Sequence, residues 1–237
     1  MTLPQPLALL LDFDGTLVPI VATPDAIVVS DDLHALIAEA MERLDGRVAI
    51  ISGRSLEQLD ALWGESLSGV TVAASHGLEL RSDGLLSAPE HSALFARLAR
   101  ATEKRFATQQ GVVIELKSFG LGLHYRLAPT LREAVHDWAK ECAENHRLAI
   151  QPGDMVFELL LPGANKGEAV RQIMDRWRFA GSSPIYIGDD LTDIPAMLAA
   201  RKFGGRGIAV GRKIAAYADD VLAGPAEVIS HIRKLLA

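Results

Sequence analysis

Short apolar runs that alternate with amphipathic segments are the feature that most limits how this chain can fold. Four runs have the length and the Gly, Ser, Asp or Pro boundaries of buried strands: residues 7–11, 48–51, 70–74 and 184–187. Helical patterns lie between or after these runs, at residues 31–44, 55–63 and 191–202. Strand–helix alternation predicts an α/β fold, with a parallel sheet that helices cover on both faces.

The middle of the chain has another pattern, in which a helical segment precedes two adjacent strand-like segments, and this order occurs twice. The helical segments are residues 89–109 and 130–146, and the strand-like segments are residues 112–117, 121–127, 148–151 and 155–161. This pattern predicts an α+β domain with an antiparallel sheet. We expect it at residues 82–163, inserted into a core domain of residues 1–81 and 164–237.

The composition of the chain limits the classes of partner that it can bind. The 237 residues carry a formal net charge of -6, which disfavours nucleic acid as a partner. The single cysteine, Cys142, permits no internal disulfide, and the apolar run at residues 7–11 is too short for a membrane span or a signal peptide. We expect a cytoplasmic protein with a small-molecule partner and no membrane association. Its oligomeric state is not readable, and a monomer is the working expectation.

Carboxylates follow two of the predicted strands. Asp12 and Asp14 come after the first strand, and Asp189 and Asp190 after the last, with Asp193 close behind. Asp-Gly pairs also mark turns and Asp caps helices, so either segment alone has that simpler reading. Both together predict a cluster of carboxylates, in which the charges raise one another's pKa values or need a cation. Oxygen ligands without a Cys cluster or a His pair favour Mg²⁺ over zinc.

Two further segments suit a phosphate group. Ser52 and Gly53 follow the strand at residues 48–51, where a hydroxyl and an unhindered backbone can meet an anion, although a plain turn fits equally well. Ser55 and Gln58 have the spacing of a capping box, and so do Asn165 and Glu168. The second box places Lys166 in the first turn of a helix, where the helix dipole disfavours a cation. A bound phosphate would convert this conflict into an attraction, whereas the simpler reading is a solvated lysine.

Polar side chains are predicted to share one face of the inserted sheet. Glu115 and Lys117 alternate on one strand, and His124 and Arg126 on its neighbour. Glu158 lies within an apolar run and needs partners if it is buried. Such a face can hydrogen-bond sugar hydroxyls, or it can be an ordinary solvated surface. The opposite face is predicted to be apolar and to hold Leu116, Leu123, Tyr125 and Leu127.

In this order, the four strand-end segments resemble the motifs of the haloacid dehalogenase superfamily of phosphohydrolases. Asp12-Phe13-Asp14-Gly15-Thr16 resembles the first motif, Ser52 the second, Lys166 the third, and Gly188-Asp189-Asp190 with Asp193 the fourth. The resemblance implies a Rossmann-like core of parallel strands. It also implies that the insert is a cap domain of the larger type.

The resemblance extends to the trehalose-6-phosphate phosphatase family over nearly the whole chain. The stretches that carry it are Ile51-Ser52-Gly53-Arg54, Ser75-His76-Gly77-Leu78-Glu79, Glu115-x-Lys117, His124-Tyr125-Arg126, Asn165-Lys166-Gly167 and Gly188-Asp189-Asp190-x-Thr192-Asp193. Two positions depart from the family pattern: Ile194 stands where an acidic residue is usual, and Ser75 where a glycine is frequent. His76 has two readings, as a structural residue or as a neighbour of the substrate.

This family resemblance implies a chemistry. Asp12 is the expected nucleophile, which forms an aspartyl-phosphate, and Asp14 the expected general acid and base. The expected ligands of Mg²⁺ are Asp12, Asp189 and the backbone carbonyl of Asp14. Lys166 and Ser52 would hold the remaining phosphate oxygens.

Other residues have supporting roles in this expectation. Asp190 and Asp193 orient the metal waters and Lys166, while Gly53 adds backbone contacts to the phosphate. The expected substrate contacts are Arg54, Glu115, Lys117, His124, Arg126 and Glu158. The expected reaction is hydrolysis of trehalose 6-phosphate. The alternatives are a related phosphatase acting on sucrose phosphate, mannosyl-phosphoglycerate or many sugar phosphates and, less favoured, a non-catalytic phosphosugar-binding protein.

Overall fold

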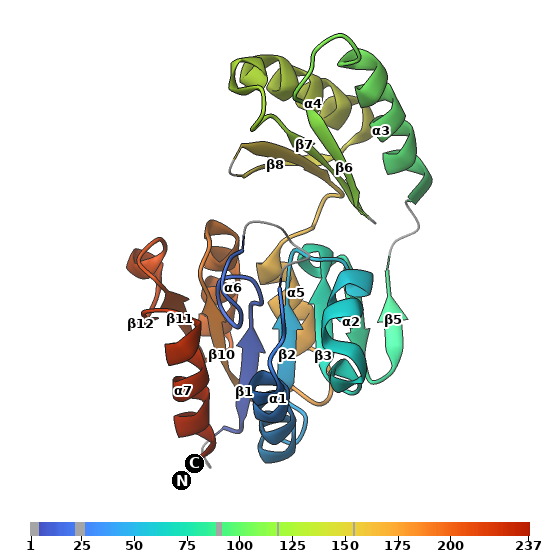
Figure 1. The fold of residues 1–237 in the computed structure, drawn as a ribbon. Helices are drawn as coiled ribbons and strands as arrows, with labels where there is room; N and C mark the ends of the chain where they lie inside the picture. Colours follow the sequence, from blue (N-terminus) through green and yellow to red (C-terminus); the bar gives the residue numbers. More distant parts are fainter. Residues whose placement is uncertain (1–4, 22–26, 89–91, 118, 154) are drawn as a thin grey trace. The chain divides into compact units, whose positions relative to one another are not determined.

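The computed structural model of the chain describes residues 5–21, 27–88, 92–117, 119–153 and 155–237. The chain forms two compact units. The larger unit comprises Met1–Ala88 and Asn165–Ala237, and the smaller unit comprises Pro89–Ala164. Each unit has its own sheet (Figure 1).

The larger unit is built on an eight-stranded sheet with the order β12-β11-β10-β1-β2-β3-β4-β5. The six strands from β12 to β3 run parallel, while β4 and β5 are antiparallel additions at one edge. The strands are β1 (Leu7–Leu11), β2 (Val48–Ile51), β3 (Thr71–Ala74), β4 (Glu79–Ser82), β5 (Leu85–Ser87), β10 (Ser183–Gly188), β11 (Arg206–Val210) and β12 (Asp220–Leu222).

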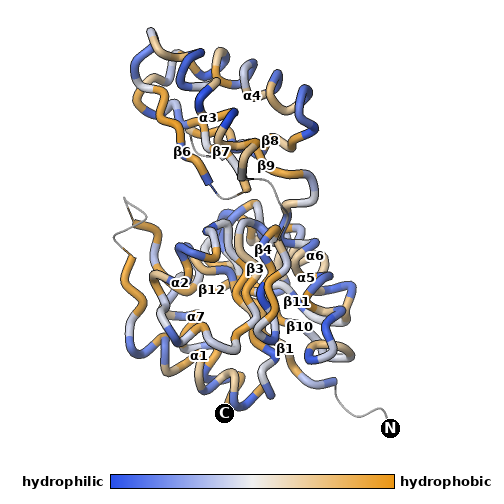
Figure 2. The backbone as a smooth tube through the Cα atoms, turned by 90° about the vertical axis from the view of Figure 1, so that its right-hand side faces the viewer, coloured by the Kyte–Doolittle hydropathy of each residue, from blue (hydrophilic) through white to orange (hydrophobic). Residues whose placement is uncertain are grey.

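Helices cover both faces of this sheet because its central strands are apolar on both sides (Figures 1 and 2). In β1, Leu9 and Leu11 belong to the core under α1, α2 and α7, while Ala8 and Leu10 belong to the core under α5 and α6. The helices are α1 (Asp31–Arg43), α2 (Leu56–Trp63), α5 (Lys166–Met174), α6 (Ile194–Lys202) and α7 (Pro225–Leu236). The predicted α/β fold with a parallel sheet is confirmed.

The smaller unit has a four-stranded antiparallel sheet with the order β6-β7-β9-β8. Its two helices pack on one face, over the buried side chains of Leu121, Leu123, Phe157 and Leu159. The elements are α3 (Ser92–Arg105), β6 (Val113–Lys117), β7 (Gly120–His124), α4 (Arg132–His146), β8 (Ala149–Gly153) and β9 (Val156–Leu160). The other face of the sheet carries polar side chains such as Glu115 and His124, together with Val113 and Val156, which pair with His124.

Several boundaries differ from the sequence pattern. The larger unit extends to Ala88 because β5 pairs with β4, whereas the pattern had the insert begin at residue 82. The helix expected from residue 89 is described from Ser92, since residues 89–91 lie outside the described part. The strand expected at residues 121–127 ends at His124, because residues 125–128 form a turn that Pro129 follows. Within the described residues, no helix is long and apolar enough to cross a bilayer.

Candidate active site

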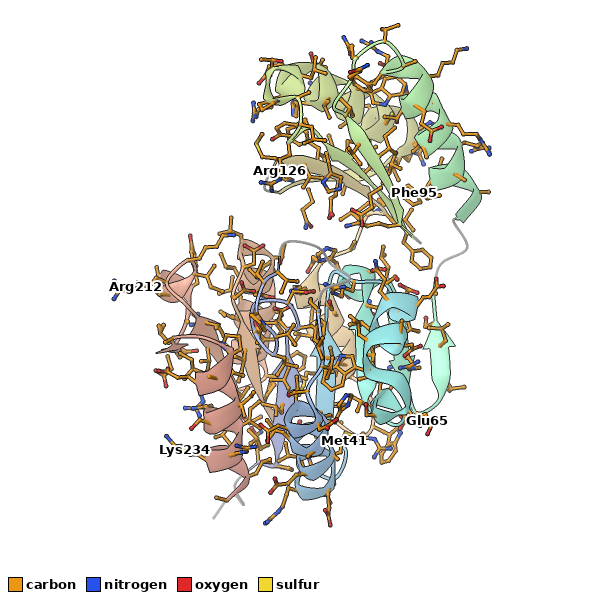
Figure 3. The ribbon with its side chains drawn as sticks, in the orientation of Figure 1. Met41, Glu65, Phe95, Arg126, Arg212 and Lys234 are labelled. Atoms are coloured by element: carbon orange, nitrogen blue, oxygen red, sulfur yellow. The ribbon has the colours of Figure 1, made fainter. Side chains whose placement is uncertain are left out.

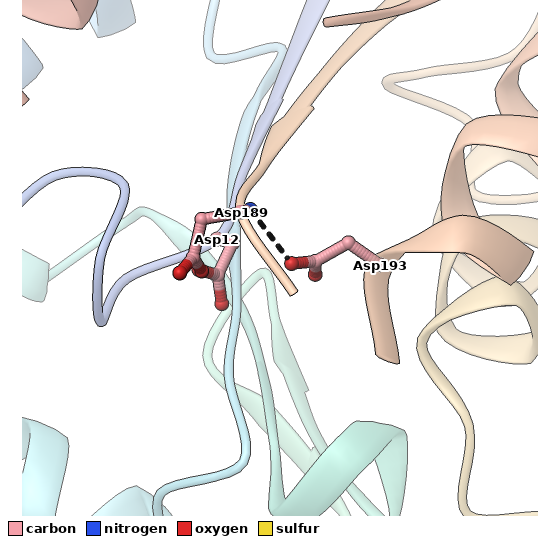
Figure 4. A group of neighbouring side chains, drawn as sticks. All are labelled: Asp12, Asp189 and Asp193. Atoms are coloured by element: carbon pink, nitrogen blue, oxygen red, sulfur yellow. Dashed lines mark hydrogen bonds between the residues drawn. The ribbon is translucent and has the colours of Figure 1, made fainter. Parts of the chain in front are cut away.

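Two neighbouring parallel strands bring the first and last carboxylate segments together. Leu11 of β1 lies beside Ile187 of β10, and the Asp12 amide donates to the Ile187 carbonyl at 2.9 Å. Carboxylate oxygens of Asp12, Asp189 and Asp193 consequently lie within 4.8 Å of one another (Figure 4). Sheet pairing thus assembles the cluster that the sequence predicted at the carboxyl ends of the strands.

Gly15 makes room for this cluster. It has a φ of +83°, which favours glycine, and a Cβ at this position would lie 2.3 Å from Asp189 Oδ2. The Asp-Gly pair therefore allows the turn after β1 and the close approach of Asp189.

Lys166 is the buried cation of the cluster. Asn165 caps α5 by accepting the Glu168 amide at 2.8 Å, which places Lys166 in the first turn as predicted. Its Nζ donates to Asp12 Oδ1 at 2.6 Å and to Asp193 Oδ1 at 2.7 Å. Burial opposes the charge, but the Asp12 and Asp193 carboxylates prevail and raise the pKa of Lys166. Carboxylates therefore offset the unfavourable helix-dipole position.

Asp193 has both of its oxygens occupied by donors. Oδ1 accepts Lys166 Nζ at 2.7 Å and the Tyr186 hydroxyl at 2.6 Å. Oδ2 accepts the amides of Asp189 and Asp190, each at 2.9 Å. This bonding suits the orienting role that the family resemblance implies for Asp193, and that role stays a prediction. The Tyr186 contact was missed, since a Tyr within an apolar run reads as a core residue.

Asp12 and Asp189 fit a divalent cation. Asp12 Oδ2 is buried and, among the described residues, has no hydrogen-bond partner. Burial and the Asp193 charge raise the pKa of Asp12 well above its ordinary value, against the lowering effect of Lys166. The same two causes raise the pKa of Asp189 to about 6. A cation would relieve both effects, and oxygen-only donors suit Mg²⁺.

Arg54 and Ser52 come from the loop after β2. The Ser52 Oγ accepts the Arg54 amide at 3.1 Å, which orients the hydroxyl. The Arg54 guanidinium donates from Nε to Asp14 Oδ2 and from Nη2 to Asp14 Oδ1, both at 2.8 Å. The sequence assigned Arg54 to the substrate, whereas the structure pairs it with the expected acid and base.

A strained turn supports the same loop. Ser75 and His76 have φ values of +49° and +56°, which are unfavourable for residues with a Cβ. Their amides donate to the carbonyls of Arg54 and Ser52 at 2.7 and 2.9 Å. A Cβ on Gly53 would lie 2.8 Å from the His76 ring. Gly53 therefore makes space for His76, a reason that differs from the predicted approach of an anion.

Glu79 fastens this turn to helix α2. Its buried carboxylate accepts the Leu56 amide at 3.1 Å and the Ser75 hydroxyl at 2.6 Å. Helix α2 begins with the predicted capping box, in which Ser55 and Gln58 bond reciprocally. The supporting role of Glu79 was not predicted, although it belongs to a stretch that the resemblance had singled out.

Asp190 lies at the edge of the cluster. Its side chain pairs with Lys213 in the loop after β11, a residue that the sequence reasoning did not consider. Burial raises the pKa of the Asp190 carboxyl, but opposing effects led by the hydrogen bond from Lys213 outweigh it, and the pKa is lowered. Arg212, beside Lys213, points into solvent (Figure 3).

The polar face of the smaller unit has four of the five predicted side chains in contact. His124 Nε2 lies 3.0 Å from Glu115 Oε2, Lys117 pairs with Glu158, and Lys117 Nζ is 3.8 Å from Glu115. The His124 hydrogen bond lowers the pKa of Glu115 despite burial. Arg126 lies in the exposed turn beyond β7, so its predicted place on the strand beside His124 is wrong (Figure 3).

The opposite face differs from its prediction at two residues. Leu123 and Tyr125 are buried as expected, but Leu116 is 54% exposed and Leu127 is 75% exposed. Leu116 lies on β6, which forms an edge of the sheet. Leu127 lies beyond the early end of β7, which removes residues 125–128 from the alternation of the strand.

The sequence matches the trehalose-phosphatase family over residues 10–213. The chain belongs to this family. The match spans Asp12, Lys166 and Asp189 together with the whole smaller unit. The matched range thus includes every predicted site residue.

Curated relatives in the trehalose-phosphatase family cover most of the chain. A probable trehalose-phosphate phosphatase of Sinorhizobium fredii is 37% identical over 213 residues, which are 88% of this chain and 79% of that protein. The trehalose-6-phosphate phosphatase of Escherichia coli is 32% identical over 203 residues, 84% of this chain and 76% of that protein.

Solved structures share the fold. A trehalose-6-phosphate phosphatase related protein aligns with a TM-score of 0.81 and 26% identity, over 97% of this chain and 96% of that one. The C-terminal domain of a Candida albicans trehalose synthase regulatory protein aligns with a TM-score of 0.72 and 12% identity, over 98% and 94%. The second likeness concerns the fold alone, so side chains must carry any functional assignment.

Proposed function

We propose that this chain is a magnesium-dependent trehalose-6-phosphate phosphatase, which hydrolyses trehalose 6-phosphate to trehalose and inorganic phosphate in trehalose biosynthesis. Family membership and the names of the relatives support the reaction. The observation that carries the proposal is the buried contact of Lys166 Nζ with Asp12 Oδ1, beside Asp189. A nucleophile, a phosphate-binding cation and a metal ligand are thereby within reach of one phosphoryl group.

Asp12 is the nucleophile of the proposed reaction. Its carboxylate attacks phosphorus in line, so that a bond from Asp12 to phosphorus forms while the bond from phosphorus to the sugar oxygen breaks. Asp14 gives a proton to the departing oxygen. A water molecule then attacks the aspartyl-phosphate and loses its proton to Asp14, which restores both residues. Lys166 and the Ser52 hydroxyl bind the equatorial oxygens.

Asp14 needs a change of partner before it can serve as an acid. Both of its oxygens accept N–H groups from Arg54, the geometry of an ionised carboxylate. The phosphate of the substrate is a competing anion for the same guanidinium. We therefore assign Arg54 a double role, in which it holds Asp14 before binding and turns to the phosphate afterwards.

Mg²⁺ has a defined set of candidate ligands in this proposal. Asp12, Asp189 and the backbone carbonyl of Asp14 would hold the ion, and Asp190 and Asp193 would orient its surroundings. When bound, the ion shields the charge between the Asp12 carboxylate and the phosphate. The buried Asp12 Oδ2, which has no hydrogen-bond partner within the described part of the chain, supports this assignment.

The smaller unit is the proposed cap domain, and its polar face supplies the sugar contacts. Glu115, Lys117, His124 and Glu158 offer donors and acceptors side by side. Gly122 on the inner strand β7 lies between Glu115 on one neighbouring strand and Glu158 on the other, and its lack of a Cβ leaves room for the contact of His124 with Glu115. Such a surface suits the hydroxyls of a disaccharide.

A phosphate-release assay over a panel of sugar phosphates tests the proposal. Trehalose 6-phosphate should be hydrolysed with the highest kcat/KM in Mg²⁺, and chelation should abolish turnover. Asp12→Asn should lower kcat by more than about a thousandfold while circular dichroism stays unchanged. The exposed Asp137→Asn is the matched control. Equal rates on sucrose phosphate or glucose 6-phosphate would instead support a broad-specificity phosphatase.

A further inference from the structure

Tyr186 is a buried tyrosine directly beneath the cluster of carboxylates. It lies on β10 beside Leu10 of β1, is fully buried, and belongs to the apolar core formed with α5 and α6. Its hydroxyl donates to Asp193 Oδ1 at 2.6 Å. A phenylalanine would fill the same apolar space, so packing alone does not account for the hydroxyl.

The surroundings keep this hydroxyl protonated and directed at Asp193. Burial and the Asp193 charge raise the pKa of Tyr186 well above its ordinary value, which favours the protonated hydroxyl that donates to Asp193. A Cβ on Gly188 would lie 2.4 Å from Asp193 Cγ, so the glycine lets Asp193 fold back against the end of β10. The backbone at the end of β10 therefore fixes Asp193 within hydrogen-bond distance of the Tyr186 hydroxyl.

Asp193 Oδ1 is shared between two donors, and this sharing affects Lys166. The oxygen accepts Lys166 Nζ at 2.7 Å, while the same Nζ reaches Asp12 Oδ1 at 2.6 Å. An acceptor that already binds a hydroxyl attracts a second donor less strongly. Without the Tyr186 hydroxyl, Asp193 would attract the ammonium more strongly and draw it from Asp12.

We infer that Tyr186 is a positioning residue of the phosphoryl-transfer site, which acts through Asp193 to hold the Lys166 ammonium at Asp12, where the transferring phosphoryl group must bind. The inference rests on the proposed function. It concerns Lys166 and the phosphoryl group, and it does not depend on which sugar is attached.

A double-mutant cycle tests this role. Tyr186→Phe, Asp193→Asn and the double variant are compared in Mg²⁺ by the inhibition constant of orthovanadate, which mimics the phosphoryl group in transfer, and by its calorimetric affinity. Tyr186→Phe should weaken vanadate about tenfold and lower kcat with little change in KM. In the Asp193→Asn background, the same change should cost less than about twofold, because the carboxylate charge that couples Tyr186 to Lys166 is gone. The half-exposed Tyr217→Phe is the control and should bind vanadate like the wild type.

Two results would overturn the inference. The first is that Tyr186→Phe binds vanadate with the affinity of the wild type, with or without a lower Tm. The second is that Tyr186→Phe loses the same vanadate affinity in the wild type and in the Asp193→Asn variant. If Tyr186→Phe does not fold, 3-fluorotyrosine at this position keeps the ring and the hydroxyl but strengthens the donor. The vanadate affinity of this 3-fluorotyrosine variant should then differ from that of the wild type, and an unchanged affinity would refute the role. Failure of the proposed substrate is distinct: trehalose 6-phosphate is not hydrolysed, yet the vanadate cycle still shows coupling.

Discussion

Arg54 holds Asp14 at two points, with Nε–Oδ2 and Nη2–Oδ1 distances of 2.8 Å. The two residues are 40 positions apart and come from loops that follow neighbouring parallel strands, β1 and β2. A guanidinium fork in this place fixes the carboxylate two residues beyond the proposed nucleophile. In the proposed mechanism, the pair therefore connects recognition of phosphate with the supply of a proton.

The Arg54→Lys variant should distinguish the effect of the positive charge at residue 54 from the effect of its two-point hydrogen bonding. Lysine retains the positive charge but cannot bind a carboxylate or phosphate at two points. We expect kcat/KM for trehalose 6-phosphate to fall about 10- to 100-fold, measured by steady-state phosphate release. Arg81 also holds a carboxylate at two points, since its Nη1 and Nη2 donate to the two oxygens of Asp60 at 2.8 Å, so Arg81→Lys is the matched control. Equal losses in the two variants would argue against a specific role for Arg54.

The raised pKa of Asp189 predicts a pH-dependent stability of the metal-free protein. The folded carboxyl keeps its proton up to about pH 6, while the unfolded carboxyl releases it near 3.8. Between these values the folded state binds more protons, so this group makes the free energy of unfolding fall as pH rises. Mg²⁺ should reverse the trend above pH 6, because it binds the ionised form.

Thermal unfolding between pH 4 and 7.5, with and without Mg²⁺, measures this effect. The difference in Tm between the wild type and Asp189→Asn should shrink as the metal-free protein is moved to low pH. Parallel pH profiles for the two proteins would contradict the assignment to Asp189.

Glu79→Gln should loosen the turn that supports Ser52 and Arg54. Glutamine loses the charge that strengthens the bonds from the Leu56 amide and the Ser75 hydroxyl. We expect a loss of about 1–2 kcal/mol in the free energy of unfolding, measured in urea, with a lower kcat. The exposed Glu57→Gln in the first turn of α2 removes only a favourable helix-dipole interaction, so it should cost less than about 1 kcal/mol and leave kcat unchanged. Unchanged stability would show that the buried carboxylate is dispensable.

Gly122→Ala should affect the sugar without affecting the phosphoryl chemistry. A Cβ there would lie 3.1 Å from His124 Nε2 and 3.2 Å from Glu115 Oε2, so their contact must shift. The KM for trehalose 6-phosphate should rise about tenfold, while hydrolysis of p-nitrophenyl phosphate stays the same. Gly224→Ala, which meets no atom within 4 Å, is the control. A parallel loss on both substrates would place the effect outside sugar recognition.

Local sequence signals predicted the elements that depend on neighbouring residues. The apolar run at Leu7–Leu11 is a buried strand, and the spacing of Ser55 and Gln58 gave a capping box that forms as expected. The strand after His124 was overestimated, because alternation continues in the sequence while the chain turns ahead of Pro129. Strand β5 was missed, since its exposed residues, Leu85–Ser87, have no strand-like alternation.

The amino-acid sequence by itself determined where β1 and β2 end and where α5 begins, and thus that Asp12, Ser52 and Lys166 lie at one edge of a sheet. The hydrophobic periodicity of a strand or helix and the capping of a helix depend on residues a few positions apart, so a short stretch of sequence is enough to predict them. Only the tertiary structure decided the partners: Arg54 on Asp14 and Tyr186 on Asp193. Strand order and register set those distances, and both arise from packing between segments that are far apart in the chain.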